Sequence, residues 1–558
     1  MPDGSGRRER SEAGPQPRQD GANGRAWLAH YPPEVAPELS YPEVPLYHFL
    51  ERAVSNRTAL IFFGRRTSYA AFWRRALSLA AALRRRGIKP GDRVATALPN
   101  CPQAAVAFFG ILAAGAVAVP CNPLYTEREL AQQLQDSGSR GLIALDLLRP
   151  RIPRADLEWV AYASIGEALP THLALLQRLR QRPPVIAAGE RYADLLAGSP
   201  EPPTPVTPDD LAVLQYTGGT TGTSKGVMLT HRNLVANMTQ TLAWLYRTRP
   251  GGEVILAVLP LFHVYGLSSV LTYGVASRAT LVLVPRLDYG QLVGMIRRHR
   301  PSIFPGAPTM YAGLIQHLQA HPGPLPRMEA GMSGSAPLPA DVQQRFEALT
   351  GIHLVEGYGL SEASPVTHCN PVWGGARAGS IGLPWPDTDA RIIDPATGAD
   401  LPTGEVGELC VRGPQVMRGY WRRPEETAEV LSDDGWLRTG DLARMDADGY
   451  FYIAGRRKDL IIASGFNIYP REVEEILRMH PAVEDVAVIG VPDHYRGETV
   501  KAVVQTRTQV SAEELDVFCR QHLAPYKVPK HYEFRDSLPR SAVGKVLYRV
   551  LREEHPAP

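Results

Sequence analysis

A segment rich in glycine and hydroxyl side chains, with a single lysine, is the part of the sequence best suited to chemistry. It spans residues 216–226 and follows the apolar run 211–217. Glycines let backbone N–H groups approach phosphate oxygens, hydroxyls donate further hydrogen bonds, and Lys225 adds a positive charge. We therefore predict a phosphate-binding loop placed between a strand and a helix. The residues expected to contact phosphate are Thr217, Gly218, Gly219, Thr220, Thr221, Gly222, Thr223, Ser224, Lys225 and Gly226.

Two other interpretations of this loop fit the sequence less well. The phosphate loop of ordinary NTPases reads G-x-x-x-x-G-K-[ST], whereas here Ser224 precedes the lysine, so that class is excluded. A flexible linker rich in Ser, Gly and Thr would need neither a flanking strand and helix nor a single lysine.

Six further motifs follow the loop along the chain. In this order they resemble the adenylate-forming superfamily, which includes acyl-CoA synthetases, peptide-synthetase adenylation domains and firefly-type luciferases. The resemblance covers essentially the whole chain beyond residue 27, and TGGTTG and GELCVRGPQVMRGYWRRPEET are most similar to bacterial long-chain fatty acid–CoA ligases. The motifs are PLFHVYG (260–266), SGSAPL (333–338), EGYGLSE (356–362), GWLRTGD (435–441), GRRKDLIIASGFNIYP (455–470) and LPRSAVGK (538–545).

The resemblance implies an ATP-dependent activation of fatty acids in two half-reactions, with Mg²⁺ and coenzyme A. A carboxylate first attacks the α-phosphate of ATP to give an acyl-adenylate and pyrophosphate, and the CoA thiolate then displaces AMP. Such catalysis is mainly positioning and charge neutralisation, without a protein nucleophile. Three alternatives stay open: a medium-chain or aryl acid–CoA ligase, a fatty acyl-AMP synthase that loads a carrier protein, and a non-catalytic relative.

The motifs assign nucleotide-binding roles by resemblance. Glu362 corresponds to the magnesium-binding glutamate, Tyr358 to the residue against adenine, and Asp441 to the acceptor of both ribose hydroxyls; Arg456 also reaches the ribose. Taken alone, these residues would read as a solvated loop carboxylate, a core tyrosine, a turn aspartate and a surface charge. The other implied positions are Gly334, Ser335, Ala336, Gly357, Gly359 and Ser361, where Ser361 replaces the usual threonine but keeps its hydroxyl.

Lys545 is the main catalytic candidate of the small domain. The resemblance implies that it bridges the attacking carboxylate and the α-phosphate during adenylation, where an ammonium offsets repulsion between two anions. Lys458 corresponds to the hinge about which the small domain swings, and Gly465 to the segment that faces the site during thioester formation. His263 corresponds to a position between the carboxylate and the thiol channel, and a core histidine is its competing interpretation.

Lysine is scarce in this chain, with only seven residues among 60 basic ones, yet three of the seven lie in these motifs. A compact point charge is the property that lysine offers over arginine. The acyl pocket is expected beyond residues 264–272 and around 305–311. Some long-chain relatives carry a tryptophan gate where this chain has Leu267, so the gating of the pocket is left open.

Alternating apolar runs and helical patterns must position these residues. Strands are expected at 93–98, 116–119, 211–217, 254–260 and 280–284, and helices at 102–115 and 231–246, which indicates α/β layers around a largely parallel sheet. Short β segments follow residue 385, and a helix at 470–479, strands at 485–491 and 500–506 and a helix at 513–523 indicate a mobile α+β unit. The expected divisions are a disordered tail 1–27, a large domain 28–455 and a small domain 456–558.

Composition narrows the class of protein. With 558 residues, 44% hydrophobic and 21% charged residues and a net charge of +3, the chain reads as a folded globular protein without a nucleic-acid partner. Five scattered cysteines argue against disulfides and a zinc site. The apolar run 104–119 is short for a transmembrane helix. We expect a cytoplasmic enzyme of lipid metabolism, β-oxidation included, with weak peripheral contact to the inner membrane; homodimerisation is left open.

Overall fold

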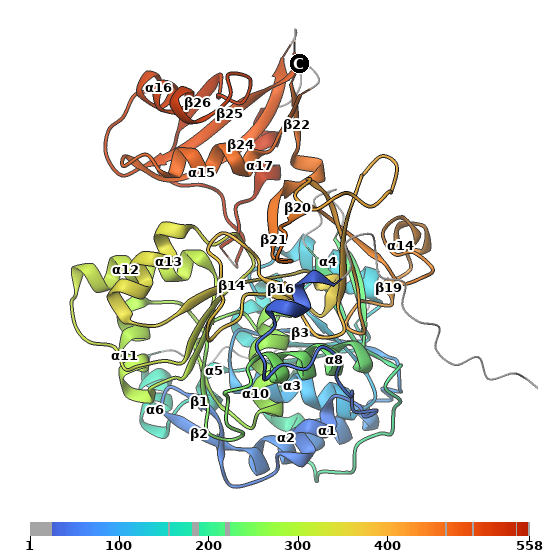
Figure 1. Ribbon diagram of the computed structural model, residues 1–558. Helices are drawn as coiled ribbons and strands as arrows, with labels where there is room; N and C mark the ends of the chain where they lie inside the picture. The colour runs from blue at the N-terminus through green and yellow to red at the C-terminus, as the bar shows by residue number, and fades with distance from the viewer. Residues whose placement is uncertain are drawn as a thin grey trace, which may run out of the picture.

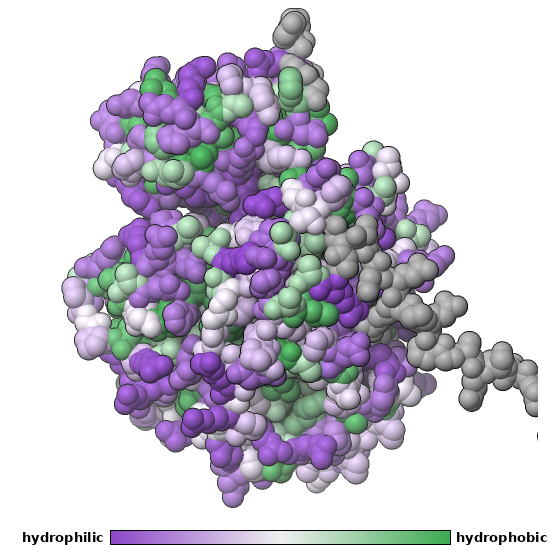
Figure 2. Space-filling view, in the orientation of Figure 1, coloured by the Kyte–Doolittle hydropathy of each residue, from purple (hydrophilic) through white to green (hydrophobic). Residues whose placement is uncertain are grey.

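The computed structural model has a large domain with a small domain above it (Figure 1). It describes residues 25–153, 157–180, 189–217, 224–463, 466–493, 496–542 and 544–555. The large domain combines two extended mixed sheets, one antiparallel sheet and helices, and the small domain has its own sheet. A notch separates the two domains at the left of Figure 2. The fold class is therefore confirmed: layered α/β subdomains, a β-rich subdomain and a small α+β C-terminal domain.

The first large sheet supplies most of the site. Six neighbouring strands, from β14 to β1, run parallel, and the edge strands β15, β16 and β2 are antiparallel. The described strands are, in spatial order, β16 (Leu383–Pro384), β15 (Val366–Cys369), β14 (Leu354–Gly359), β13 (Ala330–Ser333), β12 (Ile303–Gly306), β10 (Val254–Ala257), β11 (Thr280–Leu283), β1 (Thr58–Phe62) and β2 (Arg65–Ser68).

The second large sheet leads into the phosphate loop. Its centre is parallel, whereas β9 lies antiparallel between β8 and β19. The described strands are β19 (Gly419–Tyr420), β9 (Lys225–Thr230), β8 (Leu211–Thr217), β4 (Val117–Pro120), β3 (Arg93–Ala97), β5 (Gly141–Leu145), β6 (Trp159–Ala163) and β7 (Glu190–Arg191).

An antiparallel sheet follows and carries the chain to the small domain. Its described strands are β17 (Asp389–Ile393), β18 (Gly407–Arg412), β20 (Leu437–Met445) and β21 (Phe451–Arg456). The small domain contains β22 (Ile461–Ala463), β23 (Phe466–Ile468), β24 (Val483–Asp493), β25 (Gly497–Thr506) and β26 (His531–Phe534). The 3₁₀ turn η5 (Arg457–Asp459) joins the two sheets, and we propose the domain boundary there.

Helices cover the sheets and begin with recognisable caps. Thr230 and Asn233 form a reciprocal capping pair at the start of α8, and Pro308 and Pro470 occupy the first turns of α12 and α15. The described helices are α1 (Tyr47–Arg52), α2 (Tyr69–Arg85), α3 (Pro102–Ala113), α4 (Glu127–Ser137), α5 (Ile165–Ala168), α6 (Thr171–Arg180), α7 (Tyr192–Leu195), α8 (His231–Trp244), α9 (Val264–Gly266), α10 (Tyr273–Ala276), α11 (Tyr289–His299), α12 (Pro308–Ala320), α13 (Ala340–Thr350), α14 (Pro424–Val430), α15 (Pro470–Arg478), α16 (Ala512–His522) and α17 (Tyr548–Glu553).

Each domain has its own apolar core. In the small domain, buried side chains such as Val486, Val504 and Leu515 form a cluster apart from the core of the large domain. A unit with its own core can change orientation without unfolding. Among the described helices, none is long and apolar enough to cross a membrane. The apolar run 104–119 is instead divided between the buried helix α3 and the buried strand β4.

Two expectations need correction. The phosphate loop does not lead into a helix: it joins the antiparallel strands β8 and β9, and α8 begins only at His231. The apolar residues of 225–230 pair with β8 as a strand, so the helical pattern after the loop starts later than expected. The tail boundary at residue 27 was also placed too late, because Trp27 is buried against Phe451 and Arg25 pairs with Asp389.

Candidate active site

The site lies where parallel strands of the first sheet end. Ligands in open α/β sheets bind beyond the carboxyl ends of such strands. The chain after β10 carries His263, and the chain after β13 carries Gly334. Near its end β14 carries Tyr358, and Glu362 lies shortly beyond the strand. Three motifs far apart in the sequence therefore converge because their strands lie in one sheet.

Asp441 organises a polar cluster at this edge. It is only 6% exposed and lies on β20 directly opposite Arg456 on β21. The hydroxyl of Tyr358 donates to one carboxylate oxygen at 2.6 Å, and Arg456 Nε lies 3.0 Å from the other. The structure thus brings together three residues that the sequence assigned to adenine and ribose. A buried carboxylate held by two donors is rigid, and its remaining lone pairs can accept hydroxyl groups.

The backbone of the segment after β13 passes very close to a neighbouring side chain. A Cβ on Gly334 would come within 3.0 Å of the Tyr265 ring, and Ser335 adopts φ 72°, which is uncommon for a residue with a side chain. The hydroxyls of Ser333 and Ser335 are buried and have no hydrogen-bond partner among the residues that the structure describes. Ala336 follows in the same segment. Strained backbone and unpartnered polar atoms together mark a surface suited to a polar ligand.

The segment after β14 is equally constrained. A Cβ on Gly357 would lie 3.3 Å from the sulfur of Cys369, and one on Gly359 would lie 2.2 Å from the carbonyl oxygen of Pro365. Ser361 and Glu362 lie in the short 3₁₀ turn Ser361–Ala363. The two glycines therefore let β14 run tightly past β15 before the chain turns to present Glu362.

Tyr420 connects the loop lysine to Glu362, and sequence reasoning missed it. Its hydroxyl donates to Glu362 Oε1 at 2.8 Å, and Lys225 Nζ lies 4.9 Å from the centre of its ring. Lys225 also pairs with Glu426. Tyr420 reaches the site because β19 pairs with β9, a contact between distant segments that no motif spacing indicates.

Glu362 is a single carboxylate rather than part of a metal cage. Within the part of the chain that the structure describes, no group of three or more His, Cys, Asp or Glu side chains could hold a metal ion. Mg²⁺ is commonly held by one or two carboxylates together with substrate phosphates and water. Glu362 therefore fits a magnesium ion that arrives with ATP.

The phosphate loop itself, Gly218 to Thr223, lies outside the described residues, as does Gly465. At the base of the loop, the Ser224 hydroxyl donates to the carbonyl oxygen of Thr217. Gly226 faces Tyr216 across the hairpin, with an added Cβ only 3.1 Å from its ring.

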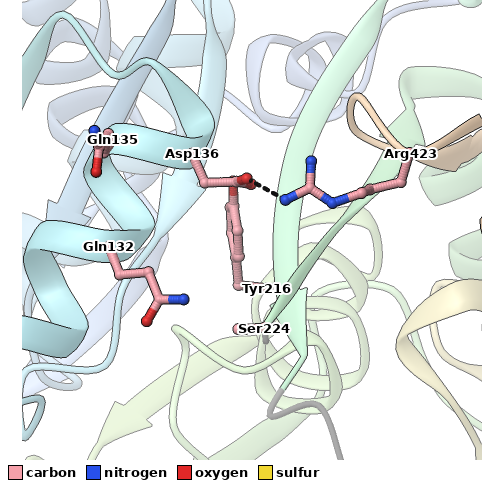
Figure 3. A pocket seen from close by; sticks show the side chains of 6 residues that line it. All are labelled: Gln132, Gln135, Asp136, Tyr216, Ser224 and Arg423. Carbon is pink, nitrogen blue, oxygen red and sulfur yellow. Dashed lines mark hydrogen bonds and ion pairs between the residues drawn. The ribbon is translucent and has the colours of Figure 1, made fainter. Parts of the chain in front are cut away.

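A small pocket of about 230 Å³ flanks this hairpin (Figure 3). The Tyr216 hydroxyl donates to Asp136 at 2.6 Å, and Arg423 donates to the same carboxylate at 2.8 Å. We place no substrate there, because the cation that lines the pocket is already paired. The pocket is lined by Gln132, Gln135, Asp136, Tyr216, Ser224 and Arg423.

The small domain brings Lys545 to the nucleotide cluster. The pKa of Lys545 is lowered to about 8, mainly by burial and also by the charges of Arg456 and Lys458, while the charge of Asp441 opposes the shift. The preceding Gly544 has φ 80°, and a Cβ there would come within 2.2 Å of Thr309 Oγ1 on α12. Only glycine lets the turn approach the large domain this closely.

His263 is neutral in this arrangement. The pKa of His263 is lowered to about 4, mainly by burial and also by the charge of Lys545. Its Nδ1 accepts the backbone N–H of Tyr265 at 3.3 Å, which leaves the ring proton on Nε2. His263 can therefore donate one hydrogen bond from Nε2 but carries no positive charge near neutral pH. Lys458, the residue expected at the hinge, is exposed in the turn between the domains.

The pKa of Lys545 leads to a prediction about pH. We expect kcat/KM for adenylate formation to fall as pH rises through about 8, because the free enzyme loses the ammonium charge there. Bound carboxylate and phosphate favour the charged amine, so kcat should fall only at higher pH. Pyrophosphate release across a pH series measures both. A flat profile from about pH 7 to about pH 9 would contradict the role of the ammonium.

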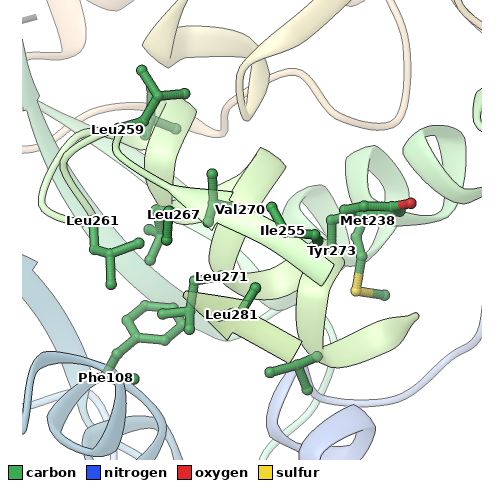
Figure 4. Close-up of a cluster of buried hydrophobic side chains, with 14 of the residues drawn as sticks. Phe108, Met238, Ile255, Leu259, Leu261, Leu267, Val270, Leu271, Tyr273 and Leu281 are labelled. Carbon is green, nitrogen blue, oxygen red and sulfur yellow. The ribbon is translucent and has the colours of Figure 1, made fainter. Parts of the chain in front are cut away.

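The segment that follows His263 in the sequence contributes to a cluster of buried apolar side chains, which is drawn in Figure 4. Leu267, Val270 and Leu271 are almost fully buried and pack with Phe108 and Leu261. The first three lie in a π-helical stretch, Leu267–Thr272, and such stretches are frequent at functional sites. Ser268 in this stretch is buried, and its hydroxyl has no hydrogen-bond partner within the described part of the chain. The region expected for the acyl group is therefore strongly apolar.

Tyr358, Asp441 and Arg456 form a polar cluster beyond the ends of parallel strands, and the small domain brings Lys545 to it. This arrangement fits the class of enzymes that activate a carboxylate as an adenylate. The chain belongs to the AMP-binding enzyme family. The family's main model matches residues 48–421, and the model of the AMP-binding enzyme C-terminal domain matches 472–545.

Characterised relatives and solved structures agree with this assignment. A long-chain-fatty-acid–CoA ligase from Bacillus subtilis is 46% identical over 553 residues, covering 95% of this chain and 98% of its own. A feruloyl-CoA synthase from an Amycolatopsis species is 39% identical and covers 90% of this chain and 96% of its own. The ATP-bound structure of MatB from Rhodopseudomonas palustris has a TM-score of 0.82 at 32% identity, covering 92% of this chain and 99% of its own.

Proposed function

We propose that this protein is an ATP-dependent long-chain fatty acid–CoA ligase. In the first half-reaction a carboxylate oxygen of the fatty acid bonds to the α-phosphorus of ATP, and pyrophosphate leaves. In the second half-reaction the thiolate of coenzyme A bonds to the acyl carbon, and AMP leaves. The products are acyl-CoA, AMP and pyrophosphate.

The observation that carries this proposal is the presence of Lys545 beside the nucleotide cluster. Its ammonium lies near enough for Asp441 and Arg456 to act on its pKa, although it belongs to the other domain. Two anions, the fatty acid carboxylate and the α-phosphate, must approach each other for adenylation. A cation placed between them in a site with little water removes several kcal/mol of repulsion.

The neighbouring residues support complementary roles. Asp441 would accept the ribose hydroxyls, Tyr358 and the segment from Gly334 to Ala336 would hold the adenine, and Glu362 would bind Mg²⁺. When bound, Mg²⁺ supplies charge neutralisation at the phosphates. His263 would donate from Nε2 to the substrate carboxylate or its adenylate.

The apolar region beyond His263 supports a fatty acyl group, as does the similarity to the Bacillus subtilis ligase. An aryl acid is the second candidate, because the feruloyl-CoA synthase is also similar. We further propose transient contact with membranes, since fatty acids partition into bilayers, and a role in fatty acid degradation or lipid synthesis. We also propose that the protein forms a homodimer.

Pyrophosphate release from MgATP tests the proposal across fatty acids from hexanoate to stearate and 4-coumarate, with and without coenzyme A. Turnover that depends on coenzyme A and is highest between myristate and stearate is expected. A maximum at hexanoate or 4-coumarate would keep the chemistry and reject the long-chain assignment. Adenylate that never passes to coenzyme A would instead indicate a carrier protein as acceptor.

A further inference from the structure

The turn that carries Lys545 is closed by its own hydrogen bonds. The backbone N–H of Ser541 donates to the carbonyl oxygen of Lys545 at 2.8 Å, and the backbone N–H of Lys545 donates to the Ser541 hydroxyl at 3.2 Å. Arg540 and Val546 form an antiparallel bridge at the base of the turn. The backbone of Lys545 is therefore fixed relative to Arg540 and Ser541.

The side chain of Arg540 fastens this turn to the body of the small domain. Its Nη1 donates to the carbonyl oxygen of Gly544 at 2.7 Å, and its Nη2 donates to Asp485 Oδ2 on β24. Asp485 directly precedes Val486, which is buried in the core of the small domain. A guanidinium is planar and rigid, so this one side chain sets the spacing between the turn and the strand.

A second anchor follows Lys545 in the chain. Tyr548, at the start of α17, donates from its hydroxyl to Glu474 Oε1 on α15 at 2.7 Å. Glu474 is only 4% exposed, and the same oxygen accepts the backbone N–H of Val488 at 2.9 Å. The chain is thus tied to the small domain on both sides of Lys545.

One arginine joins the two anchors. Arg478 Nη2 lies 3.3 Å from Asp485 Oδ1 and 3.7 Å from Glu474 Oε2. Charged groups that share partners in this way hold one another more firmly than isolated pairs do. The residues that flank Lys545 are therefore anchored in a single charge network of the small domain.

Such anchoring matters because the side chain of lysine is long and flexible. The backbone must place the ammonium, since the stem of the side chain does little to direct it. Displacement of a reacting or neutralising group by about 1 Å can cost a factor of about 100 in rate. A small shift of the turn would therefore be enough to slow a step that needs the ammonium.

We propose that Arg540 is a positioning residue for adenylation, which holds the turn so that the Lys545 ammonium meets the fatty acid carboxylate and the α-phosphate. The inference rests on the proposed function, in which Lys545 serves the first half-reaction. Arg540 acts on that step through Lys545, with Asp485 as its anchor. The Arg540 side chain is 30% exposed, so its ion pair contributes little to the stability of the domain.

Separate measurement of the two half-reactions tests this role. Arg540→Ala should lower single-turnover adenylate formation by about tenfold at saturating substrate, and thioester formation from supplied acyl-adenylate should stay within about twofold of wild type. Arg540→Lys should recover part of the rate, because an ammonium can reach one of the two acceptors. Arg549→Ala is the matched control and should change neither rate, since Arg549 is exposed and pairs with Glu553 of its own helix.

A double-mutant cycle separates positioning of Lys545 from a general effect on the small domain. In the Lys545→Ala background, Arg540→Ala should cause no further loss of adenylate formation, because the ammonium that it positions is gone. The midpoint of thermal unfolding of Arg540→Ala should stay within about 2 °C of wild type. If alanine unfolded the small domain, Arg540→Gln would take its place in the same assays.

Equal losses in both half-reactions, an adenylation rate equal to wild type, or a further tenfold loss on top of Lys545→Ala would each overturn the role of Arg540. Failure of the proposed function gives different results. If wild type forms adenylate but never a thioester, the ligase assignment fails, whereas the adenylation cycle still decides on Arg540. Adenylation by Lys545→Ala at the wild-type rate would remove the premise and the inference with it.

Discussion

Lys545→Ala should reduce acyl-adenylate formation by about 100- to 1,000-fold, while thioester formation from supplied acyl-adenylate stays within about threefold of wild type. The asymmetry follows from the position of the ammonium. It lies beside Asp441 and Arg456, where it can neutralise the approach of carboxylate and phosphate. Once the adenylate exists, the two anions have already been joined, and the lysine has no repulsion left to offset.

Single-turnover assays with labelled fatty acid and MgATP measure the first half-reaction, and purified acyl-adenylate with coenzyme A measures the second. Lys530→Ala is the matched control, because Lys530 is an exposed lysine of the same domain. It should leave both rates unchanged. If Lys545→Ala slowed both half-reactions equally, the lysine would serve the structure of the small domain rather than adenylation.

Asp441→Ala should weaken ATP binding by at least about 100-fold. The substitution removes the acceptor expected for the ribose hydroxyls. It also leaves the Tyr358 hydroxyl and the Arg456 guanidinium without the carboxylate that each contacts. Loss of a charged, buried hydrogen-bonding group is among the most damaging changes a polar site can suffer.

Equilibrium binding of ATP and KM for ATP check this prediction. Asp441→Asn keeps the shape and one acceptor oxygen, so it should fall between wild type and alanine. Asp433→Ala, at an exposed aspartate nearby in the sequence, is the control. Wild-type ATP affinity in Asp441→Ala would show that the ribose is held elsewhere.

Local sequence patterns predicted a strand or helix well where a single feature, such as an apolar run, dominates the segment. The strand expected at 211–217 is β8 with the same bounds, and the helix expected at 102–115 is α3, two residues shorter. The apolar run of a buried strand and a proline at a helix start are properties of neighbouring residues. The order of the motifs likewise predicted that Tyr358, Asp441 and Arg456 lie in one site.

Pairing between distant segments could not be predicted in this way. Tyr420 reaches Glu362 only because β19 adds to the edge of β9, and that strand is two residues long. The residues after the phosphate loop carry apolar side chains that suit a strand or a helix, and pairing with β8 decides for a strand. The close approach of Gly544 to Thr309 depends on how two domains meet, which no single segment encodes.

The register of β20 and β21 has a consequence for protein engineering. Asp441 and Arg456 stand opposite each other, and the chain leaves the sheet immediately after Arg456. A chimaera that receives its small domain from another member of the family should therefore be joined after residue 456, within the turn before Ile461. A junction placed earlier would exchange half of a matched pair, and the hybrid would inherit a nucleotide site assembled from two different parents.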